Sequence, residues 1–152
     1  MLIVLKTAGI EFDVAFNFIQ RLNVSFNGTI NHNSFESGNS KGNILPNTPL
    51  TLGNSIISYQ NSKVIQTFVK LRYVGKQFVD DNNTSEGVID PFTLVDIGSS
   101  LKIGKTALNL KINNLFDTMY PTFGYGYEWD GYWAYFWPGA TRSFYVNLAY
   151  NF

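Results

Sequence analysis

The carboxyl-terminal segment of this chain alternates without interruption between two kinds of side chain. From Arg142 to Phe152 the sequence reads RSFYVNLAYNF. In an extended strand successive side chains point to opposite faces. One face is then apolar and consists of Phe144, Val146, Leu148, Tyr150 and Phe152. The other face, formed by Tyr145, Asn147, Ala149 and Asn151, is polar and uncharged. The pattern therefore predicts a strand whose two faces need different surroundings.

The same period of two recurs in six further segments, and no segment has the period of 3.6 residues that indicates an α-helix. The predicted strands are residues 9–18, 22–32, 50–59, 64–74, 95–103 and 108–113. The third is the least regular, because Gly53 and Ser55 blur its alternation. In the fourth, Lys70 and Arg72 share the polar face. The chain is therefore predicted to be all-β.

The connections between these strands alternate in length. Three are short, at residues 19–21, 60–63 and 104–105, and three are long, at 35–49, 80–92 and 116–140. Short periplasmic turns on one rim and long extracellular loops on the other are typical of outer-membrane barrels. Strands of about ten residues also suit a tilted crossing of a bilayer. The fold class expected is an antiparallel transmembrane β-barrel segment of about seven long strands.

The composition separates this prediction from a barrel of the lipocalin type, which would bury the same apolar face in its centre. Charged residues make up 14 % of the chain, against roughly 25 % in soluble domains. The polar faces consist mainly of Asn, Ser, Thr and Gly, whereas a water-facing wall usually carries many Lys and Glu. The formal net charge is zero, so there is no electrostatic case for a nucleic-acid partner.

Other sequence features exclude further classes. No run of about 18 apolar residues predicts a transmembrane helix, which leaves a barrel open. The absence of cysteine excludes disulfides and thiolate chemistry. Residues 1–6 are too short an apolar stretch for a signal peptide, so an export signal is expected upstream of this sequence.

Two segments near the carboxyl terminus carry a composite motif, LNLKINNLFDTMY from Leu108 and YFWPGATRSFYVNLAYNF from Tyr135. The chain resembles TonB-dependent outer-membrane receptors in these segments, and more weakly upstream. The matching residues are Asn114, Leu115, Phe116, Asp117, Tyr120, Pro138, Gly139, Arg142 and the terminal Phe152.

The resemblance implies a 22-stranded barrel filled by an amino-terminal plug, of which residues 1–152 would be the carboxyl-terminal portion. The plug and the earlier strands would then be missing from this sequence. The implied function is active uptake of a scarce nutrient, such as a ferric siderophore, cobalamin or oligosaccharide, in the outer membrane of a Gram-negative bacterium. The implied partners are outer-membrane lipid, the barrel assembly machinery, the plug and remaining strands, the nutrient, and the TonB complex, which acts through the plug.

Most of the motif residues are interpreted as architectural. Pro138 and Gly139 are expected to form a turn that aims the chain into the last strand. Arg142, on the lumen face, is expected to pair with a carboxylate such as Asp96 or Asp117. The resemblance implies that Phe152 is read by the assembly machinery.

The long connection at residues 118–137 is rich in aromatic side chains, which can stack on sugars, chelates or flat macrocycles. The candidate ligand-binding residues are Tyr125, Tyr127, Glu128, Trp129, Asp130, Tyr132 and Trp133. The alternative is an interfacial aromatic girdle, which we favour for the residues from Tyr135 to Trp137. The sequence does not identify the ligand.

No catalytic residue, cofactor or metal site is predicted. His32 and Ser34 lie two residues apart on a strand, about 7 Å from one another, which is too far for a direct hydrogen bond. The run from Asp80 to Asn83 lacks the spaced ligands of a calcium loop and is interpreted as a solvated turn. A different reading of the chain is a small self-contained barrel in adhesion or envelope structure, with residues 2–5 as an eighth strand.

Overall fold

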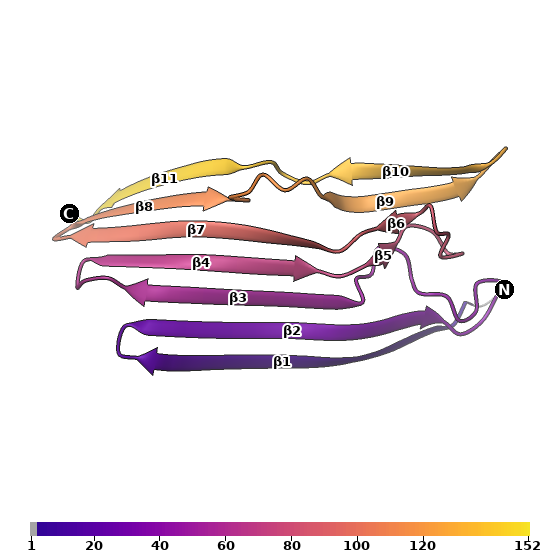
Figure 1. Cartoon of the computed structure of the whole chain (residues 1–152), viewed down its shortest axis with the longest axis horizontal. Helices are drawn as coiled ribbons and strands as arrows, with labels where there is room; N and C mark the ends of the chain where they lie inside the picture. Colours follow the sequence, from indigo (N-terminus) through magenta and orange to yellow (C-terminus); the bar gives the residue numbers. More distant parts are fainter. Residues whose placement is uncertain (1–2) are drawn as a thin grey trace.

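The computed structural model describes residues 3–152 and contains one long antiparallel sheet with two short hairpins at one end (Figure 1). The strands of the large sheet are β1 (Leu5–Ile19), β2 (Leu22–Phe35), β3 (Thr51–Gln60), β4 (Ile65–Val74), β7 (Phe92–Ile103), β8 (Thr106–Asn113) and β11 (Ser143–Tyr150). Each strand pairs with its neighbour along the chain. All seven predicted strands are thus confirmed, including the irregular third.

The register aligns the apolar residues of all seven strands in continuous rows across the sheet. One row crosses every strand: Phe16, Val24, Ile57, Val69, Ile97, Ile112 and Phe144. Because side chains alternate along each strand, this alignment gives the whole sheet one apolar face and one polar face. Lys70 lies opposite Asp96 on the polar face. This agrees with the prediction that the charged residues of the fourth strand lie on its polar face.

Two of the predicted long loops contain short strands that the alternation did not predict. β5 (Gln77–Phe78) pairs with β6 (Val88–Ile89), and β9 (Pro121–Glu128) pairs with β10 (Tyr132–Pro138). The second hairpin lies beyond the end of β8, beside the first (Figure 1). Glycine is depleted in strands, so Gly124 and Gly126 made residues 121–128 look like a loop. The alternating aromatic residues Phe123, Tyr125 and Tyr127 indicate a strand there.

The predicted eighth strand is not a separate element in the part of the chain that the structure describes. Leu5 opens β1 and pairs with Phe35 of β2, and the Val4 carbonyl accepts a hydrogen bond from the Glu36 N–H at 2.8 Å. Leu2, with which that strand would begin, lies outside the described residues. The sheet consequently ends at β1 on one side and at β11 on the other.

The few buried apolar side chains lie at or near the long-loop end of the sheet rather than along it. They are Phe35, Val79, Ile89 and Leu94. Most apolar residues of the strands are exposed or half-buried, including Val146 of β11 at 73 %. Residues 3–152 contain no helix that is long and apolar enough to span a bilayer.

A charge in the middle of the apolar row tests which face meets lipid. We expect Val69→Arg to destabilise the folded barrel by about 2–4 kcal/mol, because a lipid-facing cation near the bilayer midplane must be desolvated. Gln66→Arg, on the polar face of the same strand, is the control and is expected to change little. Heat-modifiable gel migration after incubation in increasing urea measures both. Equal sensitivity of the two variants would contradict the assignment of faces.

Candidate functional site

Asn114 connects three segments at the end of β8. Its backbone takes φ 49°, a left-handed conformation that Asn adopts more readily than most residues. Its side-chain amide donates to the carbonyls of Thr118 at 2.9 Å and Ala140 at 3.1 Å, and its oxygen accepts from the Thr118 N–H at 2.9 Å. The side chain, buried to 4 % exposure, therefore ties the end of β8 to the approaches of β9 and β11.

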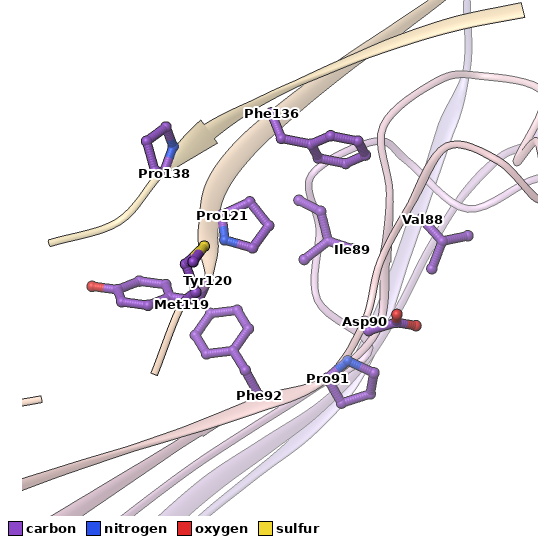
Figure 2. A pocket seen from close by; sticks show the side chains of 10 residues that line it. All are labelled: Val88, Ile89, Asp90, Pro91, Phe92, Met119, Tyr120, Pro121, Phe136 and Pro138. Carbon is purple, nitrogen blue, oxygen red and sulfur yellow. The ribbon is translucent and has the colours of Figure 1, made fainter. Parts of the chain in front are cut away.

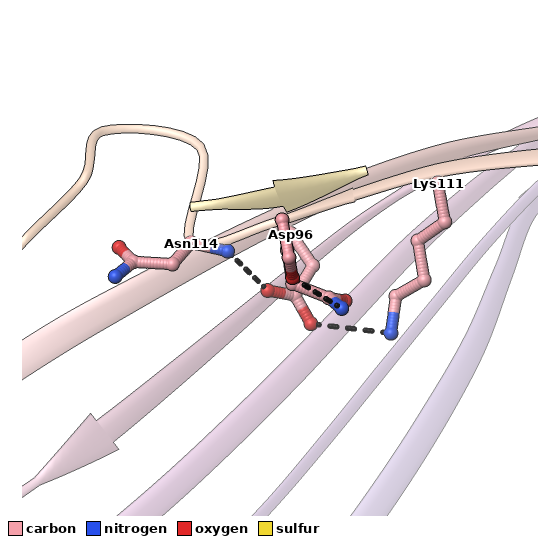
Figure 3. Close-up of polar contacts among 5 residues, drawn as sticks. Asp96, Lys111 and Asn114 are labelled. Atoms are coloured by element: carbon pink, nitrogen blue, oxygen red, sulfur yellow. Dashed lines mark hydrogen bonds and ion pairs between the residues drawn. The ribbon is translucent and has the colours of Figure 1, made fainter. Parts of the chain in front are cut away.

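Asp96 of β7 lies beside this junction on the polar face (Figure 3). It accepts a hydrogen bond from the Asn114 N–H at 3.0 Å and forms an ion pair with Lys111 at 3.5 Å. Of the two carboxylates predicted as partners of Arg142, Asp117 contacts it and Asp96 does not. The backbone N–H of Arg142 donates to Asp117 at 2.7 Å, while its guanidinium donates to the Leu115 carbonyl at 3.4 Å. Lys111 occupies the position beside Asp96 because the β7–β8 register places it nearer.

Six aromatic residues of the β9–β10 hairpin fall on one face, because cross-strand partners share a face. Trp133 pairs with Tyr127, Tyr135 with Tyr125 and Trp137 with Phe123. We call these six side chains the aromatic face. Among them, the rings of Tyr127 and Tyr135 stack with centroids 6.1 Å apart. The aromatic face therefore includes residues from both predicted groups, the recognition residues from Tyr125 to Trp133 and the girdle residues from Tyr135 to Trp137.

The other face of the hairpin packs against the connection that follows β5. Gly124 and Gly126 are buried there, and a Cβ on Gly124 would collide with Val79. Tyr132 belongs to this packed face. It therefore points away from Tyr125 and Trp133, which the sequence analysis grouped with it as candidate ligand-binding residues. Of the predicted residues, Glu128 ends β9, and Trp129 and Asp130 form the hairpin turn, which Gly131 closes with φ 105°.

Tyr132 holds the hairpin to a buried carboxylate outside the seven-stranded sheet. Its hydroxyl donates to Asp80 at 2.6 Å, and Asp80 also accepts from the Asn82 N–H and from Thr84. Burial raises the pKa of Asp80, but the hydrogen bonds from Tyr132, Thr84 and Asn82 together outweigh it and lower the pKa. Burial, then the bond to Asp80, raises the pKa of Tyr132 above its ordinary value of 10.0.

Two asparagine side chains link the long connections to one another through hydrogen bonds to backbone groups. Asn47 donates to the Gly124 carbonyl and accepts from the Gly124 N–H, both at 2.9 Å. Asn83 likewise accepts from the Ile44 N–H at 2.7 Å and donates to the Ile44 carbonyl at 2.8 Å. The three long connections consequently pack as one body above the sheet.

This packing creates a polar hollow of about 410 Å³ between the connections. Four predicted ligand-binding residues line it, namely Tyr125, Tyr127, Glu128 and Tyr132. Asp80, Asp81 and Asn82, interpreted from the sequence as a solvated turn, line it too. Trp129, Asp130 and Trp133 do not line it. The sequence offered no signal for this meeting, because the two segments lie about 50 residues apart.

A second, more apolar hollow of about 450 Å³ lies between the start of β7 and the hairpin (Figure 2). Its walls include Val88, Ile89 and Phe136, and the rings of Phe92 and Tyr120 lie 4.8 Å apart at its edge. None of the predicted ligand-binding residues lines it. Aromatic and aliphatic walls of this kind can hold the apolar part of a ligand.

Two other sequence interpretations concern catalysis and metals. His32 and Ser34 lie on β2, where His32 is exposed and Ser34 is buried beside Ile44. Among residues 3–152, no group of three or more His, Asp or Glu side chains is placed to hold a metal ion.

The architecture and the site can now be compared with known proteins. The model of the TonB dependent receptor-like, beta-barrel family matches residues 4–115. The chain belongs to this family. The family consists of transport receptors rather than enzymes, and the predicted location in the outer membrane of a Gram-negative bacterium is confirmed. The lipocalin-like alternative is thereby excluded.

The relatives of this receptor chain are much longer than it is. The chain is 28 % identical over 133 residues to the iron-regulated outer membrane virulence protein of Vibrio cholerae, covering 84 % of this chain and 20 % of that protein. It is 27 % identical over 156 residues to the ferrioxamine receptor of Yersinia enterocolitica, covering 97 % and 21 %. Among solved structures, the ferric yersiniabactin uptake receptor FyuA of Yersinia pestis superposes with a TM-score of 0.82 at 18 % identity, covering 97 % and 24 %. The chain thus spans about a fifth to a quarter of these proteins.

Phe152, the predicted assembly signal of the receptor barrel, lies just beyond β11. Its ring is fully exposed and lies 5.3 Å from that of Tyr150, nearly perpendicular to it. The Asn151 N–H still donates to the Lys105 carbonyl at 2.9 Å, so pairing with the β7–β8 turn continues past the last strand residue. The role of Phe152 in barrel assembly stays a prediction.

Asn114 has two separable roles, which substitutions distinguish. We expect Asn114→Ala to destabilise the receptor barrel by about 1–3 kcal/mol, because buried partners lose their hydrogen bonds. Asn114→Gly should be milder, since glycine adopts a positive φ without strain. Asn113→Ala is the control, because Asn113 donates only one long bond, to Ser143 at 3.3 Å. Urea midpoints of the purified receptor measure all three, and an equal loss for Asn113 and Asn114 would contradict the junction role.

Tyr132→Phe removes the hydroxyl that partners buried Asp80. We expect faster amide hydrogen exchange across residues 79–87, while Tyr125→Phe, on the aromatic face, leaves it unchanged. Because the folded pKa of Asp80 is below 3.8, its stabilising contribution is complete above that pH and is lost as the pH falls through the lower folded value. The Tyr132 effect should therefore persist at neutral pH and vanish in strong acid. Unchanged exchange at pH 7 would contradict it.

Proposed function

We propose that this chain is part of an outer-membrane receptor that takes up a ferric siderophore by active transport. The main support for this proposal is the family membership, together with relatives named for iron regulation and for ferrioxamine. Cobalamin and oligosaccharide are the alternative nutrients, and neither is represented among those names. The polar and apolar hollows at the long-loop end would contact the ligand.

In this proposal residues 1–152 are the carboxyl-terminal portion of the barrel domain, and the plug and earlier strands belong to the same receptor. The apolar face would meet outer-membrane lipid and the polar face would enclose the plug. The TonB complex would act through the plug to energise transport, and the barrel assembly machinery would read Phe152. The unpaired edges of β1 and β11 support this arrangement, because backbone groups facing lipid need partners.

The candidate ligand surface within the proposal is the polar hollow with the hairpin turn above it. Tyr125, Tyr127, Glu128 and Tyr132 would contact a ligand in the hollow, whereas Trp129, Asp130 and Trp133 would contact it during capture. Stacking by exposed rings and hydrogen bonding by the acids supply recognition without covalent chemistry. The part of the aromatic face farther from the turn, namely Phe123, Tyr135 and Trp137, would instead serve as an interfacial girdle.

The second candidate function, a small self-contained barrel in adhesion or envelope structure, makes a different prediction for the isolated chain. Such a barrel would fold alone and show heat-modifiable gel migration. We expect the isolated 152-residue chain not to fold in this way, because a sheet with two open edges is not closed. Folding of the isolated chain would favour the alternative.

The transport proposal is tested in the source bacterium by deleting the gene and supplying iron only as a defined ferric siderophore. We expect growth on at least one hydroxamate or catecholate chelate to be lost, and growth on free iron salts and on cobalamin to be retained. Complementation with Tyr127→Ala and Trp133→Ala should lower uptake of radioactive ferric chelate. The aromatic control is Tyr59→Ala, on the apolar face at the short-turn end of β3. Unchanged growth on every chelate would contradict a siderophore ligand.

A further inference from the structure

The β9–β10 hairpin has one strand edge that nothing covers. On the side of β9 away from β10, the Val79 carbonyl accepts a hydrogen bond from the Gly126 N–H at 3.2 Å. The Asn47 side chain bonds both backbone groups of Gly124 on the same side, each at 2.9 Å. β10, by contrast, pairs with β9 alone among the strands of residues 3–152. The outer edge of β10 is therefore open.

The register shows which backbone groups point out of this open edge. Cross-strand partners in an antiparallel pair alternate between those that exchange hydrogen bonds and those that do not. Gly124 and Gly126 direct their backbone groups away from β10. Their respective partners, Phe136 and Ala134, therefore direct theirs away from β9. Within residues 3–152 no hydrogen bond from another segment reaches these outward groups of Ala134 and Phe136.

The open edges of β10 and β11 belong to one continuous margin. In Figure 1, β10 lies in line with β11, and β9 lies in line with β8. The Gly139 N–H donates to the Tyr120 carbonyl at 2.7 Å, and the Asn114 side chain bonds the approaches to both β9 and β11. Only residues 139–142 separate β10 from β11. A strand that pairs with β11 and continues in the same direction therefore arrives at the open edge of β10.

The opposite side of the sheet shows strands that continue in this way. β2 pairs with β3 only as far as Ile30, but it pairs with β1 as far as Phe35. β1 has 15 residues, which is more than the roughly 9–11 that cross a bilayer. Strand pairing beyond the sheet at its long-loop end is thus already part of this architecture.

We propose that the upstream receptor strand that closes the barrel against β11 continues outside the membrane and pairs with β10. Closure against β11 is obligatory, because lipid provides no hydrogen bonds to an open edge. The inference rests on the proposed function, since the closing strand belongs to the complete receptor. Pairing on both sides makes the β9–β10 hairpin a fixed part of the barrel wall, so its aromatic face does not act as a mobile lid.

Position favours the closing strand over a free peptide or a second receptor as the partner of β10. The closing strand is already held along β11, so its pairing with β10 is intramolecular and occurs at a high effective concentration. A separate molecule would have to be ordered against a single edge of seven residues, and that ordering costs free energy.

Photo-crosslinking in the complete receptor, in its own outer membrane, identifies the partner of each edge. Tyr135 of β10 and Tyr145 of β11, both exposed, are replaced one at a time by the aromatic photoreactive residue benzoylphenylalanine. We expect both positions to link to the same upstream segment of the same polypeptide. The two linkage points should lie about ten residues apart and in reversed order, because antiparallel partners are counted in opposite directions.

The results at the two positions separate this pairing from the proposed function. A product at position 145 with none at 135 would overturn the pairing with β10 alone. A product at 135 that joins lipopolysaccharide, a second receptor or a different segment would do the same. If position 145 gave no upstream product, the closed barrel of the proposed function would fail as well.

Amide hydrogen exchange in the same complete receptor tests the hydrogen bonds of the β10 edge. We expect the Ala134 and Phe136 amides to exchange at least about a hundredfold more slowly than in an unstructured peptide, because both N–H groups are bonded in the proposed pairing. The Tyr135 amide, which faces β9, is the slow reference, and the Asp130 amide in the turn is the fast one. Fast exchange at 134 and 136 beside slow exchange at 135 would overturn the proposal.

Discussion

Hydrogen bonding between neighbouring strands is the constraint on which the rest of this structure depends. Each strand of the large sheet buries little apolar area against any other element, and the apolar row through Val69 and Ile97 lies at the surface. The sheet is held in shape by the backbone pairing that joins β1 to β11 in chain order. In a bilayer that pairing is obligatory, because lipid offers no hydrogen bonds to an unpaired N–H or C=O.

In the long connections at the end of the sheet, side-chain hydrogen bonds replace the backbone pairing between strands. The Asn47 and Asn83 amides each bond both backbone groups of one residue in a neighbouring segment, as an adjacent strand would. Asp80 and Tyr132 add a buried polar contact between the β5–β6 and β9–β10 regions. The candidate hollows lie between these segments, so the contacts that hold the connections together also shape the space in which a ligand would bind.

Local alternation was enough to predict all seven long strands, the two faces of the sheet and the short turns. It failed in the long connections, where Gly124 and Gly126 read as loop residues although they leave room for Val79 and Tyr132. The alternating Phe123, Tyr125 and Tyr127 carried the missing signal. The composite motif identified the receptor family, but it did not reveal that Asn114 joins three segments through its side chain.

The sequence by itself determined the faces, because the direction of a side chain along a strand depends only on its position in that strand. It also determined that Lys70 and Arg72 lie together. Only the tertiary structure decided which residues from different strands meet, since register joins positions far apart in the chain. For that reason Lys111 rather than Arg142 pairs with Asp96, Tyr132 turns away from the aromatic face toward Asp80, and Lys70 and Arg72 come to line one hollow with Asn113.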